Sequence, residues 1–136
     1  MARRWKREEI GYTGASFPWR LTTSGRVATS TVNFEEGDMT HIAEAIVQVI
    51  RTIKGERVMR RSWGASPVDV VFRPNTELGM LLAVSEIQDV LNEYEPRVSL
   101  IEGKVVDSNP EQGTVTLRLG FRHNKTQIVD RIEVTV

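Results

Sequence analysis

The sequence contains no cysteine among its 136 residues. Disulfide bridges, thiol catalysis and zinc sites built on cysteine are therefore excluded. A chain without cysteine fits a reducing compartment, where disulfides do not persist. At this length we expect one domain with a hydrophobic core that needs no covalent crosslink.

Neither sign of charge is in excess, because Lys and Arg together number 18 and so do Asp and Glu. A dedicated nucleic-acid binder normally carries a basic excess. No apolar run approaches the roughly 18 residues that a membrane-spanning helix needs. The opening MARRWKREEI also lacks the apolar stretch of a signal peptide. We therefore expect no nucleic-acid partner, no membrane partner, and synthesis and use in the cytoplasm.

Groups typical of catalytic and metal sites are sparse. His41 and His123 lie far apart in the sequence and have no cysteine partners, so each is expected to be a surface or capping residue. Ser62 and Ser66 lack the glycine-flanked turn that presents a hydrolase nucleophile. The sequence thus predicts no catalytic residue, no metal and no cofactor.

Residues 1–37 form a distinct segment, rich in glycine, serine and threonine and without a sustained hydrophobic period. We expect a mostly irregular N-terminal arm, either flexible or ordered on a partner. Its candidate contact residues are the aromatic side chains of Trp5, Phe17 and Trp19. Four cations surround Trp5 and could hold a phosphate backbone. Glu8 and Glu9 follow at once and weaken that alternative.

Two helices are predicted, at 39–54 and 76–94, because apolar residues recur there at helical spacing. Asp38 is placed to cap the first helix, and Gly55 to adopt the left-handed conformation after its last turn. The apolar positions are Ile42, Ile46, Val49, Ile50 and Ile53 in the first helix, and Met80, Val84, Ile87, Leu91 and Tyr94 in the second. Between the helices, SPVDVVF (66–72) is expected to form a helical turn or a short strand.

From residue 97 onward the hydrophobic period changes to two, which predicts β-strands. They span about residues 98–107, 113–123 and 128–136. The alternation slips near Leu100 and Ile101, as a bulge would cause, and the short links imply antiparallel neighbours. The predicted fold class is α+β: two main helices packed on one face of a three-stranded antiparallel meander. Residues 38–136 make up this domain.

The junction between the second helix and the first strand of the meander reads Glu95-Pro96-Arg97. Pro96 disfavours helical conformation at the residue before it, so the helix should end near Tyr94. Glu95 then carries a negative charge at a helix C-terminus, where it is electrostatically disfavoured. Arg97 offers a planar fork that can hold a carboxylate. Two interpretations stay open: a local ion pair worth at most about 1 kcal/mol, or a docking group for another chain.

Two stretches follow the two helices, TIKGERVMRRSWG (52–64) and YEPRV (94–98). Together they resemble the baseplate wedge family of contractile phage tails, whose members are lysozyme-like wedge subunits and sheath initiators. The counterpart of this family in type VI secretion is the baseplate component TssE. The matching positions are Thr52, Gly55, Glu56, Arg57, Met59, Trp63, Gly64, Phe72 and Glu95-Pro96-Arg97. The resemblance spans roughly residues 17–136, with Trp63 where Phe is usual.

The resemblance implies a structural role in a virion tail baseplate that is assembled in the host cytoplasm. Family members sit beside a helical core bundle of other wedge proteins, and their Glu-Pro-Arg segment is similar to a docking element for it. For this chain, the implied wedge contacts are Glu56, Arg57, Glu95, Pro96 and Arg97. An internal structural role for Arg57 is the alternative. On composition alone, the N-terminal arm is expected to reach tail tube or hub proteins.

The small sheet of family members resembles the C-terminal domain of the tail sheath protein. It serves as the template on which the first sheath ring assembles by strand addition. Strand addition needs an edge with backbone groups to offer, and a three-stranded meander has two edges. The last strand runs to Val136 without a polar tail, so we expect Ile132, Val134 and Val136 to meet the sheath protein. An ordinary C-terminal strand is the alternative.

Because some family members are described as lysozyme-like, a peptidoglycan-degrading baseplate component is the alternative function. Such chemistry needs two carboxylates about 5 Å apart for retention or about 6.5–9.5 Å apart for inversion. The candidates are Asp89, Glu93 and Glu95 near the end of the second helix, and Glu35, Glu36 and Asp38 near the start of the first. Acids on helices usually form a solvated face, so we expect a non-enzymatic protein.

Overall fold

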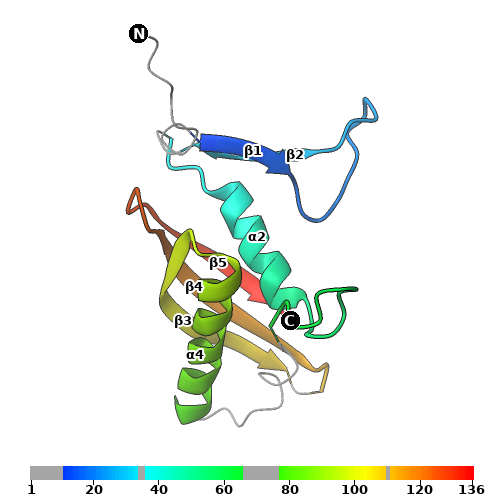
Figure 1. Cartoon of the computed structure of the whole chain (residues 1–136). Coiled ribbons are helices and arrows are strands. Elements are labelled where there is room, and N and C mark those ends of the chain that lie inside the picture. The colour runs from blue at the N-terminus through cyan, green and yellow to red at the C-terminus, as the bar shows by residue number, and fades with distance from the viewer. Residues whose placement is uncertain (1–10, 34–35, 66–76, 110) are drawn as a thin grey trace. The chain divides into compact units, whose positions relative to one another are not determined.

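The computed structural model describes residues 11–33, 36–65, 77–109 and 111–136 (Figure 1). The chain forms two compact units, Met1–Ala45 and Ile46–Val136, which divide within helix α2. The domain boundary predicted from the sequence, between an arm of residues 1–37 and a domain of residues 38–136, stays a prediction. Several features singled out in the sequence lie outside the described residues: Trp5 with the cations around it, Glu8, Glu9, Glu35 and the whole of SPVDVVF (66–72). None of the described helices is long and apolar enough to span a membrane.

The first unit contains a two-stranded antiparallel sheet made of β1 (Gly11–Ala15) and β2 (Thr29–Asn33). An isolated bridge between Leu21 and Val27 continues the hairpin toward its tip. The sequence predicted an irregular segment here, and the hairpin is the main difference from that expectation. Each strand is only five residues long, which is too short for a two-residue period to stand out among glycine, serine and threonine.

Helix α2 (Thr40–Arg51) begins at the predicted cap. The Asp38 carboxylate accepts hydrogen bonds from the Thr40 backbone N–H at 3.0 Å and from the Thr40 hydroxyl at 2.6 Å. These bonds lower the pKa of Asp38, and the bond from the Thr40 hydroxyl contributes more than the bond from the Thr40 N–H. Thr31 donates a further bond to this carboxylate at 2.9 Å. The predicted apolar face is buried at Ile42, Ile46, Val49 and Ile50.

The same helix ends before the predicted residue 54. The Val49 carbonyl accepts the N–H of Ala65 at 3.1 Å, and the N–H of Ile53 donates to the Glu56 carboxylate at 3.1 Å instead of continuing the helix. Ile53 is consequently 44% exposed, not buried on the helical face. Gly55 follows with a φ of 94°, which is the positive φ predicted for it.

The second unit contains a three-stranded antiparallel sheet with the order β3 (Val98–Asn109), β4 (Thr114–His123) and β5 (Val129–Thr135). This confirms the predicted meander. The alternating side chains of β4 form the centre of its buried face: Val115, Leu117, Leu119 and Phe121. The register of β3 on β4 shifts twice, between Leu100 and Glu102 and between Val105 and Asp107. The first shift lies where the sequence alternation slips.

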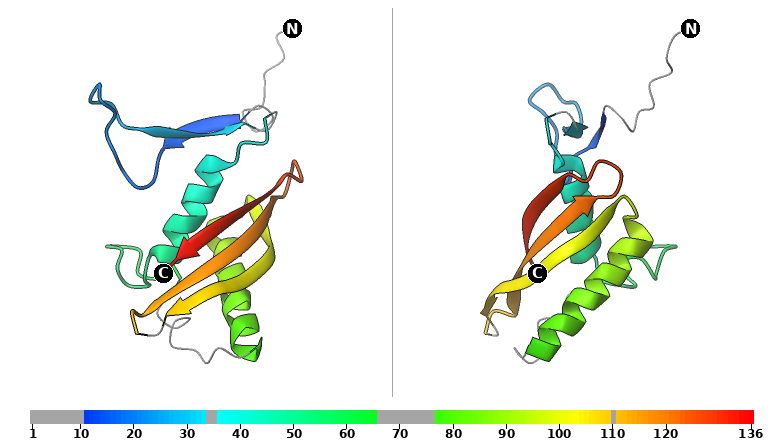
Figure 2. Two further views of the ribbon diagram at one scale, coloured as in Figure 1. Left: turned by 180° about the vertical axis from the view of Figure 1, so that it is seen from behind. Right: turned by 90° about the vertical axis from the view of Figure 1, so that its left-hand side faces the viewer.

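Helix α4 (Glu77–Tyr94) packs against β3. It lies on the same face of the three-stranded sheet as the last turns of α2, residues 46–51 (Figure 2), which confirms the predicted layering. Among the side chains of α4 that the structure describes, Ala83, Ile87 and Leu91 are buried. A Cβ at Gly103 of β3 would lie 2.7 Å from Cγ2 of Val84. Glycine at this position therefore lets strand and helix approach closely.

Candidate partner-binding surfaces

The Glu95-Pro96-Arg97 junction connects α4 to β3. The N–H of Glu95 donates to the Leu91 carbonyl at 2.8 Å and completes the last turn of the helix. Both oxygens of the Glu95 carboxylate accept hydrogen bonds from Arg97, one from Nε and the other from Nη2 at 2.6 Å. The Glu95 side chain is only 6% exposed, whereas that of Arg97 is 35% exposed. The two charges therefore form a bidentate ion pair, and a contact with another chain stays a prediction.

The turn between β4 and β5 holds the junction through its backbone. The Asn124 N–H donates to the Arg97 carbonyl at 2.9 Å, and the Asn124 side-chain amide donates to the Pro96 carbonyl at 3.0 Å. The Asn124 side chain also contacts the Ser99 hydroxyl through Oδ1 at 2.6 Å. The sequence gives no signal for this role of Asn124, because the composition of the turn does not show which carbonyls its side chain meets. Pro96 itself is exposed.

His123 is the titratable group beside this junction. Its Nδ1 accepts the Thr126 N–H at 3.2 Å, and the ring is buried at the end of β4. Burial, followed by the positive charges of Arg97 and Lys125, lowers the pKa of His123, while the charge of Glu95 acts in the opposite direction. The folded protein therefore favours a neutral ring here. Of the two roles predicted for His123, the surface position is wrong, because the ring is buried, and the capping role fits the bond that Nδ1 accepts from the Thr126 N–H of the following turn.

The loop after α2 brings the second motif to the first. The Arg57 guanidinium lies 3.6 Å from the centroid of the Trp63 ring, in a cation–π contact. The Trp63 ring in turn lies 5.8 Å from that of Tyr94, centroid to centroid. The Tyr94 hydroxyl donates to the Ser62 carbonyl at 2.8 Å. Because Tyr94 directly precedes Glu95, the 52–64 stretch and the junction lie side by side, although 30 residues of sequence separate them.

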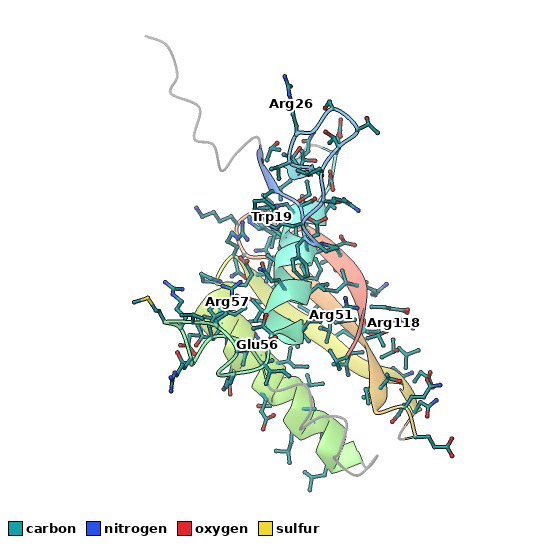
Figure 3. The ribbon with its side chains drawn as sticks, turned by 90° about the vertical axis from the view of Figure 1, so that its right-hand side faces the viewer. Trp19, Arg26, Arg51, Glu56, Arg57 and Arg118 are labelled. Carbon is teal, nitrogen blue, oxygen red and sulfur yellow. The ribbon has the colours of Figure 1, made fainter. Side chains whose placement is uncertain are left out.

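Backbone geometry keeps this loop folded. The Gly55 N–H donates to the Arg61 carbonyl at 2.7 Å. Gly64 has a φ of 111°, and a Cβ there would lie 2.3 Å from the Thr52 carbonyl oxygen. Glu56 turns its carboxylate back onto the loop, where it accepts a backbone N–H. Figure 3 shows Glu56 and Arg57 on this loop. Both predicted wedge contacts thus have internal partners, which does not test whether they also meet another chain.

Among the strands that the structure describes, β5 lies at the edge of its sheet and pairs with β4 alone. Val136 and Val115 exchange two backbone hydrogen bonds of 2.9 Å, and the register from there is unbroken. In an antiparallel ladder every second residue bonds the partner strand. Residues 130, 132, 134 and 136 therefore turn their backbone groups to β4, and residues 129, 131, 133 and 135 turn theirs outward. The predicted edge residues Ile132, Val134 and Val136 belong to the inward set, and Val134 is fully buried.

Two of the outward groups of β5 have partners in the same unit. The Thr135 carbonyl accepts a bond from Nε of Arg51 at 3.2 Å, and the Arg131 N–H donates to Oδ1 of Asp130 at 2.8 Å. The other edge of the sheet, β3, is interrupted by its two register shifts. Bulges make an edge a poor template for a further strand. Of the two edges, β5 has the regular register that strand addition requires.

A polar cluster in the first unit was not predicted. The Ser30 hydroxyl bonds both Nδ1 of His41, at 2.8 Å, and the Glu44 carboxylate, and the Phe17 N–H also donates to Glu44 at 3.3 Å. A Cβ on Gly14 would lie 2.5 Å from the His41 ring. The hairpin and the first turn of α2 are joined here. The residues lie far apart in sequence, so no local pattern could signal the cluster.

This cluster is not arranged as a catalytic triad. In a triad the acid orients the imidazole, and the imidazole takes the serine proton. Here the acid bonds the serine hydroxyl, which has one proton to donate, so His41 must donate to Ser30 rather than accept from it. Ser30 is also buried. In the part of the chain that the structure describes, no three His, Asp or Glu side chains gather as metal ligands.

Residues 36–128 match the family model described as "Baseplate wedge protein gp25". The chain is 34% identical over 90 residues to baseplate protein W of Escherichia phage P2, and the match covers 65% of this chain and 76% of that protein. The chain therefore belongs to the baseplate wedge protein gp25 family. It is a structural baseplate component of a contractile tail, which confirms the family resemblance read from the sequence.

Two solved structures are similar to this one. A protein from Geobacter sulfurreducens, described as a candidate tail lysozyme, has a TM-score of 0.62 and 26% identity, and the match covers 80% of this chain and 95% of that one. A chain of the anti-feeding prophage baseplate has a TM-score of 0.61 and 16% identity, over 92% of this chain and 84% of that one. At 16% identity, the similarity to the anti-feeding prophage chain shows a shared fold.

Proposed function

We propose that this protein is a non-enzymatic wedge subunit with two assembly surfaces. One is the surface formed by the Glu95-Pro96-Arg97 junction and the adjacent 52–64 loop, which docks onto neighbouring wedge proteins. The other is the outer edge of β5, to which a strand of the tail sheath protein adds when the first sheath ring forms. Assembly takes place in the host cytoplasm, and the completed protein resides in the tail baseplate.

The unbroken register of β5 at the edge of the sheet is the observation that carries the sheath proposal. The outward backbone groups of Val129, Arg131 and Glu133 are spaced as an incoming antiparallel or parallel strand requires, and the Arg131 N–H would exchange its bond to Asp130 for one to that strand. The side chains of these residues lie on the exposed face, so an added strand would not disturb the core. Ile132 and Val136 turn their backbone groups to β4 and are half-buried, so they would meet the sheath strand through their side chains, whereas Val134 is fully buried.

The junction supports the wedge proposal through its rigidity. The buried Glu95 carboxylate fixes Arg97, and Asn124 fixes the backbone on both sides of it. An interface built on groups that are already ordered loses less conformational entropy on binding. The exposed Pro96 and the one-third exposed Arg97 are the parts of this junction that a partner can reach.

We also propose that the hairpin of the first unit contacts tail tube or hub proteins. Trp19 is 73% exposed and Leu21 is 68% exposed. Exposed aromatic side chains are common at the centre of protein interfaces. Phe17 is half-buried and donates its N–H to Glu44, so it has a place in the fold as well.

The sheath proposal is tested by Glu133→Pro, with Glu133→Ala as the matched control. Both variants lose the ion pair with Arg118, whose Nη2 lies 2.6 Å from Oε1 of Glu133. Only proline removes the outward N–H of residue 133, and proline is tolerated where a strand faces solvent. We expect sheath polymerisation on isolated baseplates to fail with Glu133→Pro and to proceed with Glu133→Ala. Normal polymerisation on both variants would refute strand addition at β5.

We propose that the protein has no lysozyme activity, in contrast to the alternative function considered from the sequence. Both oxygens of Glu95 already accept bonds from Arg97, and Asp38 is occupied in capping α2, so neither presents a proton to a glycosidic oxygen. Asp89, Glu93 and Glu36 are exposed. A peptidoglycan-clearing assay with purified protein should show no activity above buffer. Clearing that is lost in an Asp89→Asn/Glu93→Gln variant would support the lysozyme instead.

A further inference from the structure

The tip of the loop after α2, residues 57–61, presents apolar side chains to solvent. Val58 is 91% exposed and Met59 is 95% exposed. These are the highest exposures among the large apolar side chains that the structure describes. We call residues 57–61 the knob. Single apolar side chains scattered over a surface are ordinary. Two adjacent and almost fully exposed ones at the tip of an ordered loop indicate a binding surface instead.

The knob is held in shape by the rest of its loop. Arg57 lies over the ring of Trp63, and the N–H of Trp63 donates to the Arg60 carbonyl at 3.1 Å. Met59 has a φ of 62°, a conformation that favours Gly or Asn and that costs energy for methionine. A sequence that needed only a turn here would place Gly or Asn at this position. Methionine at the tip therefore points to a use for its side chain.

The knob is also the most basic part of the loop. The cations between residues 54 and 61 are Lys54, Arg57, Arg60 and Arg61, against the single acid Glu56. The Glu56 carboxylate accepts the Ile53 N–H and so turns back onto the loop. The whole chain has no net charge. The positive charge around Val58 and Met59 is therefore local, and it favours a negatively charged partner surface.

We propose that the knob inserts Val58 and Met59 into an apolar pocket with an acidic rim on a neighbouring wedge subunit. This rests on the proposed function, because the knob adjoins the Glu95-Pro96-Arg97 junction through the contacts of Arg57 with Trp63 and of Trp63 with Tyr94. Methionine adapts to irregular pockets, and arginine is enriched at protein interfaces. A nucleic acid would also match the local charge, but a chain with no net charge lacks the basic excess that is typical of a dedicated nucleic-acid binder.

The first test removes the apolar tip. In cells that express the complete tail gene cluster, tagged wild-type protein is compared with a Val58→Ser/Met59→Asn variant. Asn accepts the positive φ of position 59, so the melting temperature should not fall. The matched control is Leu78→Gln/Leu81→Gln on α4, where the leucines are 68% and 62% exposed. We expect at least tenfold less of the wedge subunits with the knob variant and an unchanged amount with the control.

The outcomes separate the two proposals. If wild type recovers no wedge subunit, the proposed function fails. If wild type and the knob variant recover wedge subunits equally, or if only the α4 control loses them, the knob proposal is overturned and the proposed function stands. Purified wild type is also mixed with duplex DNA and with vesicles of anionic lipid. Binding of either one that the knob variant abolishes would overturn the choice of a protein partner.

The second test concerns the acidic rim. We expect Arg60→Glu/Arg61→Glu to abolish recovery of wedge subunits, while the control Lys104→Glu/Arg122→Glu, which reverses two exposed cations of the sheet, leaves recovery unchanged. A photo-crosslinking residue at position 59 should attach to a wedge-subunit peptide rich in Asp and Glu, and the same residue at position 81 should not. Equal loss with both reversals, or a crosslinked peptide of net positive charge, would overturn the proposal.

Discussion

The Trp63 ring lies against the Tyr94 ring with the centroids 5.8 Å apart and the planes inclined by 52°. Trp63 closes the loop after α2, and Tyr94 ends α4. The contact therefore joins the two stretches that carry the family resemblance, and it places Arg57 near the junction at Glu95. Trp63 is only 9% exposed. Its contact with Tyr94 aligns the loop with the junction, and its burial also stabilises the folded protein.

Trp63→Ala should destabilise the protein by about 3 kcal/mol, the usual cost of removing a buried aromatic side chain. Tyr94→Phe retains the ring and loses the hydrogen bond to Ser62, which should cost about 1 kcal/mol. Denaturation of both variants in urea checks the two values. If Trp63→Ala costs no more than Tyr94→Phe, the ring contact contributes little and the alignment of the loop has another cause.

Gly64→Ala should cost about 3–5 kcal/mol, because a positive φ is combined with a Cβ that would lie 2.3 Å from the Thr52 carbonyl oxygen. Gly55→Ala is the matched comparison. Gly55 has a φ of 94° but nothing within 4 Å of a Cβ, so this change should cost only about 1–2 kcal/mol. Thermal denaturation of the two variants measures the difference. Equal losses would show that the backbone of Thr52 moves away without cost.

Glu95→Ala should destabilise the protein by about 2 kcal/mol, because it leaves the Arg97 guanidinium without its buried partner. The cost is below the value for a fully buried pair, since Arg97 is 35% exposed and keeps some hydration. The Glu95→Ala/Arg97→Ala double variant should lose about 1 kcal/mol less than the sum of the single changes. A double-mutant cycle in urea gives this coupling. Additive losses would mean that the ion pair contributes nothing to stability.

The stability of the protein should fall between about pH 7 and pH 5 because of His123. The pKa of this buried ring is lowered from its ordinary value of 6.5. As the pH falls through 6.5, the unfolded chain takes up a proton that the folded chain resists, so unfolding becomes easier. Asp38, with a pKa lowered from 3.8, contributes stability that is lost only in more acidic solution.

His123→Asn tests this prediction, because Oδ1 of Asn can accept the Thr126 N–H in place of Nδ1 and does not titrate. The slope of unfolding free energy against pH in this window should be smaller in the variant. The free energy of unfolding at pH 7.5 serves as the reference for any loss unrelated to the proton. An unchanged slope would show that the acid sensitivity belongs to other groups.

Local patterns in the sequence predicted much of this protein. The two-residue period of Val115, Leu117, Leu119 and Phe121 predicted a half-buried strand, and β4 has these side chains in its core. The cap at Asp38 and the positive φ of Gly55 also follow from residues next to them. The order and spacing of the two motifs identified the family. Each of these features depends on neighbours in the chain, which the sequence shows directly.

The tertiary structure alone decided which distant residues meet. It ended α2 early because Ala65 takes the Val49 carbonyl, and it placed Arg57 over Trp63. It also set which residues of β5 turn their backbone outward, since that depends on the register with β4. These outcomes come from hydrogen bonds and ring contacts between segments whose approach costs chain entropy and is set by the packing of the whole unit. No local period or motif encodes them.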